Sequence, residues 1–219
     1  MGNGLHLLDI VFFAMVAAFL ILRLRSVLGR RTGNEPPPPQ MRPQRADKDN
    51  VIDMVAVRKP VSEPAADTPV GRGLAAIRAS DPSFDTDGFL AGAGAAFEMI
   101  VSAYASGNSA ALRPLLSDEV YRNFAGAIEA RNRAGERLET RVLGVHSATV
   151  AEAGMDGTLA HVTVRFVTDQ INVLTDAAGR ILEGEPERPT EVTDEWTFRR
   201  NVRSPNPNWE LVATRSPES

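Results

Sequence analysis

The chain has 219 residues, contains no cysteine and carries a formal net charge of −4. This length allows one domain with a hydrophobic core plus additional segments, and the lack of cysteine excludes disulfides, a thiolate nucleophile and Cys-ligated zinc. Residues 71–219 hold 15 basic and 21 acidic residues. We therefore expect no nucleic-acid partner, because binding to phosphates requires a basic face.

An apolar segment near the N-terminus predicts a membrane anchor within residues 1–31. Residues 10–22 are apolar without interruption, and extending the segment back to residue 5 gives about the 20 residues that a span requires. A cleaved signal peptide carries its positive charges before the apolar stretch, whereas here they follow it. A buried or interfacial helix is the alternative, which an apolar surface on every side disfavours. By the positive-inside rule, the flanking arginines hold the main domain in the cytoplasm and leave the N-terminus outside; they are Arg23, Arg25, Arg30 and Arg31.

A proline-rich stretch, residues 32–70, predicts a flexible linker. Eight of the 15 prolines lie between positions 36 and 69. Proline at this density favours polyproline II and prevents regular hydrogen bonding. Within the linker, the apolar sequence "VIDMVAV" at residues 51–57 is expected to dock on the folded domain, with recognition of a partner as the alternative.

Residues 71–219 read as a folded domain that begins with helices. The first helix, in "GLAAIRASDPSF", should end at Asp81, because the residue before a proline disfavours helical conformation. Asp85 or Asp87 should cap a second helix and Ser117 a third. Apolar residues recur at helical spacing in the second and third helices: Phe89, Leu90, Ala93, Phe97, Ile100, Val101 and Tyr104, then Val120, Phe124 and Ile128.

From Leu138 onward the apolar pattern changes to the alternation of β-strands. "TDAAGR" at residues 175–180 predicts a turn between strands. Helices followed by consecutive strands indicate an α+β domain with a mostly antiparallel sheet, which helices close into a cone. Three sets of residues are expected to face inward: Val162, Val164 and Phe166; Val192, Asp194, Trp196 and Phe198; and Trp209, Leu211 and Ala213.

Three glycines in the second predicted helix do not form a phosphate-binding loop. No strand precedes Gly88, Gly92 and Gly94, and neither Lys-Ser nor Lys-Thr follows them. We expect them to permit close packing of the helix on its neighbours.

Ionisable residues show no catalytic or metal-binding pattern, so neither a metal nor a cofactor is expected. His146 and His161 lack metal-ligand spacing and are interpreted as surface or edge residues. Asp194 is the one acid expected on the inward face. A buried carboxylate there would be a candidate general base, with solvation or an arginine partner as the alternative.

Several stretches together resemble the Tim44-like domain family. They are "DPSFDTDGFLAGAGAAFEMI", "VYRNFAGAIEARNRAG", "VTVRFVT", "VTDEWTFRR" and "NPNWELVAT", and the resemblance covers about residues 74–214. The apolar anchor and proline-rich linker are similar to those of bacterial members. The resemblance implies a cone-like α+β fold related to the nuclear-transport-factor-two superfamily, association with the bacterial inner membrane, and contact with phospholipid.

This resemblance implies a large apolar pocket and a role in membrane complexes or translocation. The expected function is a non-enzymatic, membrane-tethered adaptor whose partners are translocase subunits or another inner-membrane protein complex, and phospholipid. The alternatives are a lipid carrier or sensor, and a cone-fold enzyme acting on a hydrophobic substrate. Candidate pocket residues are Phe89, Phe97, Ile100, Phe124, Ile128, Val164, Phe166, Trp196 and Phe198.

Deletion of residues 1–31 should release a soluble, folded domain, because the expected core begins beyond residue 71. Sedimentation and a cooperative thermal transition measure the outcome. Aggregation of the shortened chain would mean that the anchor or linker belongs to the fold.

Overall fold

A computed structural model describes residues 64–217. The predicted anchor, its flanking arginines, nearly all of the predicted linker and the apolar segment at 51–57 lie outside the described residues. The helices are α2 (Pro69–Ser80), α3 (Thr86–Ala105), α4 (Ser109–Leu112) and α5 (Asp118–Arg133). The strands are β1 (Arg137–Asp156), β2 (Leu159–Thr175), β3 (Ile181–Glu183), β4 (Thr190–Asn201) and β5 (Glu210–Arg215).

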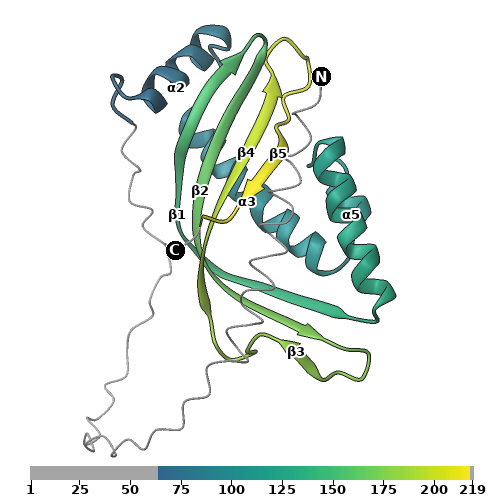
Figure 1. The fold of residues 1–219 in the computed structure, drawn as a ribbon. Helices are drawn as coiled ribbons and strands as arrows, with labels where there is room; N and C mark the ends of the chain where they lie inside the picture. The colour runs from purple at the N-terminus through teal and green to yellow at the C-terminus, as the bar shows by residue number, and fades with distance from the viewer. Residues whose placement is uncertain (1–63, 218–219) are drawn as a thin grey trace, which may run out of the picture.

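The strands form one antiparallel sheet in the order β1-β2-β4-β5, and the short β3 pairs with β2. Figure 1 shows α3 crossing one face of this sheet, α2 lying at the far end of β1, and α5 standing beside β5. Helices packed on an antiparallel sheet confirm the expected α+β class.

Bulges bend the long edge strand β1. Its register with β2 shifts three times, between Val142 and Gly144, between Val145 and Ser147, and between Val150 and Glu152. Each extra residue increases the local twist of a strand. In Figure 1, β1 and β2 accordingly turn along their length, so that the half carrying β3 swings away from the half that faces α3.

The predicted helix ends agree with the structure. α2 ends at Ser80, directly before Asp81-Pro82. Asp85 is the N-cap of α3, where its carboxylate accepts a 2.6 Å hydrogen bond from the Gly88 amide. Ser117 caps α5. The short α4 was not predicted, since four residues are too few to show a helical period.

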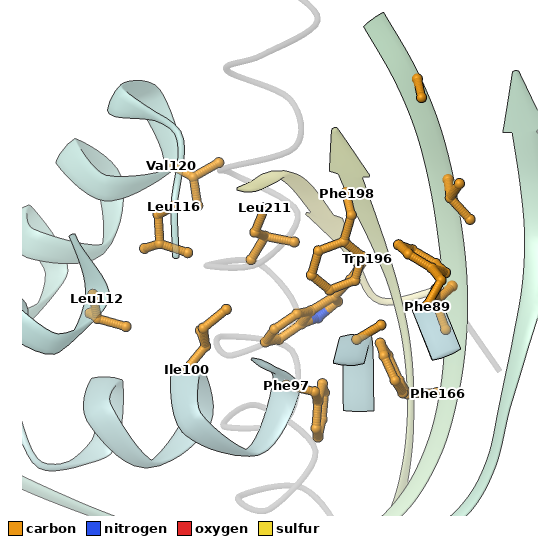
Figure 2. Packing of buried hydrophobic residues seen from close by; sticks show 14 of the residues in the cluster. Phe89, Phe97, Ile100, Leu112, Leu116, Val120, Phe166, Trp196, Phe198 and Leu211 are labelled. Carbon is orange, nitrogen blue, oxygen red and sulfur yellow. The ribbon is translucent and has the colours of Figure 1, made fainter. Parts of the chain in front are cut away.

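The inward face of α3 packs on the sheet and contributes Phe89, Ala93, Phe97, Ile100 and Ala103 to the core. Its side chains meet the inward residues of β2 and β4, while Leu112 and Leu116 approach Leu211 from the other side (Figure 2). Within residues 64–217, α3 is the one helix long and apolar enough to cross a membrane. Since Phe97 and Ile100 are buried against the domain, α3 serves here as a core helix.

The last strand corrects one sequence prediction. Trp209, Leu211 and Ala213 were expected to share a face, but Ala213 is exposed while Thr214 is buried. The cause is a register shift in the β4–β5 pairing, where Phe198 pairs with Leu211 and Thr197 with Ala213, which leaves Val212 as an extra residue. One inserted residue reverses the facing of every residue after it.

Close packing also occurs at a different helix from the one predicted. A Cβ added at Gly92 or Gly94 would meet nothing within 4 Å, so close packing does not explain these two glycines. The tight approach is instead at Gly73 of α2, whose added Cβ would overlap the backbone carbonyl of Ala153 in β1. Gly92 is exposed on the side of α3 that faces away from the sheet.

Two glycine substitutions should therefore change the stability of the domain in opposite directions. Gly73→Ala should lower the free energy of unfolding by about 1–3 kcal/mol, because α2 must move away from β1. Gly92→Ala should raise it by about 0.5–1 kcal/mol through helix propensity alone. Denaturant titration of both variants measures the difference, and equal effects would contradict the assigned packing.

Candidate functional site

The nine predicted pocket residues form part of the hydrophobic core. Eight are buried, and Phe124 is half-buried against Tyr104, with ring centroids 5.1 Å apart. The ring centroid of Phe97 lies 4.7 Å from that of Phe166 and 4.6 Å from that of Trp196. Figure 2 shows these rings turned toward one another between α3 and the sheet. A ligand in this region would therefore have to separate aromatic rings that touch.

Asp194 lies at the margin of this core and is half-buried. It pairs across the strands with Phe166, and its carboxylate accepts a 2.7 Å hydrogen bond from the hydroxyl of Ser216. Burial raises the pKa of Asp194, and the bond from Ser216 partly opposes this effect. The structure therefore gives this acid a serine partner in place of the arginine considered above.

The most deeply buried of the described acids is Glu195, on the opposite face of β4, with 2% of its surface exposed. Asp194, the one acid expected on the inward face, is therefore not the most deeply buried of the described acids. Alternation along β4 places Glu195 on the face opposite Asp194 and Trp196. Long arginine side chains cover that face, and their apolar stems exclude water from the carboxylate.

Two arginines hold Glu195 from neighbouring strands. Cross-strand register places Arg165 of β2 on one side of it and Arg215 of β5 on the other. Arg165 donates from Nε and Nη2 to Oε1, at 2.8 and 2.6 Å, and Arg215 donates to Oε2. Burial by itself raises the pKa of Glu195, but the bonds from both arginines outweigh it and hold this pKa below its usual value.

The outer arginine layer, defined as Arg165, Arg199 and Arg215, exposes much of its guanidinium surface. The side chains of Arg165 and Arg215 are 52% and 59% exposed, although both bind Glu195. Arg199 pairs with Glu210 across β4 and β5. Nothing in the alternating sequence pattern distinguishes these arginines from ordinary solvated charges, so the sequence analysis missed them.

A polar hollow of about 500 Å³ adjoins this layer at the start of α5. Arg199 and Glu210 form one wall, and the first turn of α5 forms the other. Its lining residues are Ser117, Asp118, Glu119, Arg122, Arg199, Glu210 and Val212. The layer and the hollow together make a charged surface suited to contact with a polar segment of another protein.

Replacing Glu195 should destabilise the domain. Glu195→Gln should lower the free energy of unfolding at neutral pH by about 1–3 kcal/mol, because two arginines lose their shared charge. Since the folded-state pKa of Glu195 is lowered, its contribution is present above the unfolded-state pKa and disappears as the pH falls through the folded-state value. Denaturant titration at several pH values measures this.

Asp194→Asn is the matched control on the adjacent residue. Because burial raises the pKa of Asp194, removing its charge should leave stability at neutral pH unchanged or increased. If Asp194→Asn lowered the free energy of unfolding more than Glu195→Gln does, the assignment of the two acids would be contradicted.

Two solved structures are similar to the chain at low scores. The intermembrane-space region of the chloroplast protein ARC6 is 17% identical with a TM-score of 0.41, covering 63% of this chain and 100% of that chain. A protein of the NTF2-like family from Streptomyces avermitilis is 16% identical with a TM-score of 0.35, covering 62% of this chain and 100% of that chain. Likeness at this level bears on neither site nor function.

Sequence relatives are more informative. The mitochondrial import inner membrane translocase subunit TIM44-1 of Arabidopsis thaliana is 26% identical over 123 residues, 56% of this chain. The chain spans about a quarter of that relative's length, 26%. The Tim44-like domain matches residues 70–216, nearly all of the described fold. The chain therefore belongs to the Tim44-like domain family.

Proposed function

We propose that this protein is a non-enzymatic adaptor that is tethered to the inner membrane and holds its folded domain beside a membrane protein complex of the translocase type. The observation that carries the proposal is the Tim44-like match over residues 70–216. A relative that shares this region is named as a subunit of a mitochondrial inner-membrane import translocase. Protein translocation and the assembly of membrane complexes are the processes that suit such a tether.

The packing of the core favours a binding role over catalysis. An enzyme using the apolar interior would require an ionisable group among the aromatic rings. Asp194, the candidate for that role, lies at the margin of the core, where it accepts a hydrogen bond from the exposed Ser216. Glu195 lies on the other face and is held by Arg165 and Arg215. The alternative of a cone-fold enzyme therefore depends on Asp194, and Asp194→Asn would test it against an identified substrate.

The charged outer surface is the proposed contact site for a protein partner. The outer arginine layer offers guanidinium groups that are fixed by Glu195 and Glu210 yet remain partly exposed. Fixed arginines lose less conformational freedom on binding than free ones, and they suit carboxylate-bearing partners. Exposed charge of this kind supports specificity and rapid association more than high affinity.

The predicted anchor and linker supply the tether. The 32 residues at positions 32–63 would reach on the order of 100 Å if extended, at about 3.1 Å per residue. Such a linker keeps the domain near the membrane and leaves its orientation free. Its effect on binding is to raise the effective concentration of the domain beside a membrane-embedded partner.

A lipid carrier or sensor is the second candidate function. An acyl chain would have to enter between α3 and the sheet, where Phe97 touches Phe166 and Trp196. Binding would therefore require the loss of aromatic contacts worth about 0.5–1.5 kcal/mol per pair beyond their burial. The adaptor function needs no such opening.

Purification of the full-length chain in mild detergent should recover stoichiometric inner-membrane proteins. The test variant carries Arg165→Glu on the outer surface. Because Arg165 also holds the buried Glu195, a cooperative thermal transition must first show that the variant is folded; it should then lose these partners while still fractionating with membranes. Mass spectrometry of proteins and lipids measures both. Recovery of lipid alone would support the carrier function, and equal recovery of protein partners by the variant would exclude the outer arginine layer as the contact site.

A further inference from the structure

Three metal-ligating side chains converge on the outer face of the sheet, away from the outer arginine layer. They are His146, Asp169 and Glu191, and each offers one ligand atom within 4.8 Å of the other two. His146 Nε2 lies 2.8 Å from Asp169 Oδ2. His146 shows no metal-ligand spacing in the sequence, because Asp169 and Glu191 are distant from it along the chain.

Three adjacent strands bring the cluster together. Asp169 of β2 is the direct cross-strand partner of Glu191 in β4. On the other side, Asp169 pairs with Gly144 of β1, two residues before His146. His146 is itself the extra residue between Val145 and Ser147 in the β1–β2 register. A bulge redirects side chains, and here it brings an imidazole to the carboxylates of the two neighbouring strands.

The two carboxylates of the cluster differ from several other carboxylates of the described domain in having no arginine partner. Several carboxylates elsewhere pair with arginine, as Glu195 does with Arg165 and Glu210 with Arg199. Within residues 64–217, no ion pair joins either Asp169 or Glu191 to an arginine. Two carboxylates side by side repel each other in the absence of a cation, so the cluster favours a positive charge between them.

We propose that His146, Asp169 and Glu191 bind a divalent transition-metal ion of the zinc class. One imidazole nitrogen and two carboxylate oxygens form a borderline ligand set that suits zinc, cobalt or nickel better than calcium, which prefers oxygen alone. Ligands of a tetrahedral zinc ion lie about 3.3 Å apart, given bond lengths of about 2.0–2.1 Å. Closing the present 4.8 Å spread requires only small rotations of the exposed His146 and Glu191 side chains toward the half-buried Asp169.

A metal ion at this place would link β1, β2 and β4 where the sheet bends. Three protein ligands leave at least one coordination position open to solvent. The ion would therefore fix the relation of the two halves of the sheet and present a site that a carboxylate of another molecule could complete.

The two histidines of the folded domain provide a matched test. The full-length chain, purified in mild detergent without a histidine tag and freed of metal by chelation, is titrated with zinc by calorimetry and with cobalt by visible absorption. One equivalent should bind, with d–d bands showing nitrogen and oxygen ligands. His146→Ala should weaken binding by more than the ~10–100-fold typical of removing a residue hydrogen-bonded to a ligand, whereas His161→Ala should bind like the unaltered chain.

Glu191→Gln is a second variant, chosen because Glu191 is exposed and its replacement leaves the core intact. It should also weaken binding of cobalt and zinc. Lack of stoichiometric binding would overturn the proposal and leave His146 and Asp169 as a simple ion pair. The proposal would also be overturned if His146→Ala and His161→Ala lost the same amount of metal affinity, or if Glu191→Gln bound zinc and cobalt as tightly as the unaltered chain.

Discussion

The contact of Phe97 with Phe166 and Trp196 is the interaction on which the rest of the domain depends. It joins α3 to the two central strands, and all three rings are at most 6% exposed. Burying each ring contributes on the order of 2–3 kcal/mol, to which favourable ring geometry adds about 1 kcal/mol per pair. Because this contact fixes α3 across the sheet, it also determines which face of β4 is covered by helices and which is left to charged residues.

The two faces of β4 therefore have separate roles. Trp196 and Phe198 point into the core, whereas Glu195, which directly precedes Trp196, points outward and organises Arg165 and Arg215. The inner face supplies stability, and the outer face supplies fixed, partly exposed charge. In the adaptor function proposed above, contacts with a partner would be made on the sheet's outer surface and at the hollow beside α5.

Local signals in the sequence predicted the parts of the fold that depend on neighbouring residues. Asp85 and Ser117 have the chemistry of helix caps, and the alternation of Val162, Val164 and Phe166 specifies an inward face without reference to a partner strand. Features that arise from pairing between strands were missed. The extra residue Val212 reverses the facing of Thr214, and the bulge at His146 places an imidazole beside carboxylates distant in the chain. Glu195 was missed because its burial comes from arginines on other strands.

The central claim is that the aromatic core stays closed, so that binding takes place on the surface. Trp209→Phe leaves Trp196 as the single tryptophan of the chain, buried beside Phe97. Its fluorescence should be measured while the full-length chain is reconstituted into phospholipid vesicles with brominated acyl chains. The account predicts that Trp196 emission is unaffected by the bromine atoms. Strong quenching, which requires bromine close to the indole ring, would show that acyl chains enter the core and would contradict the account.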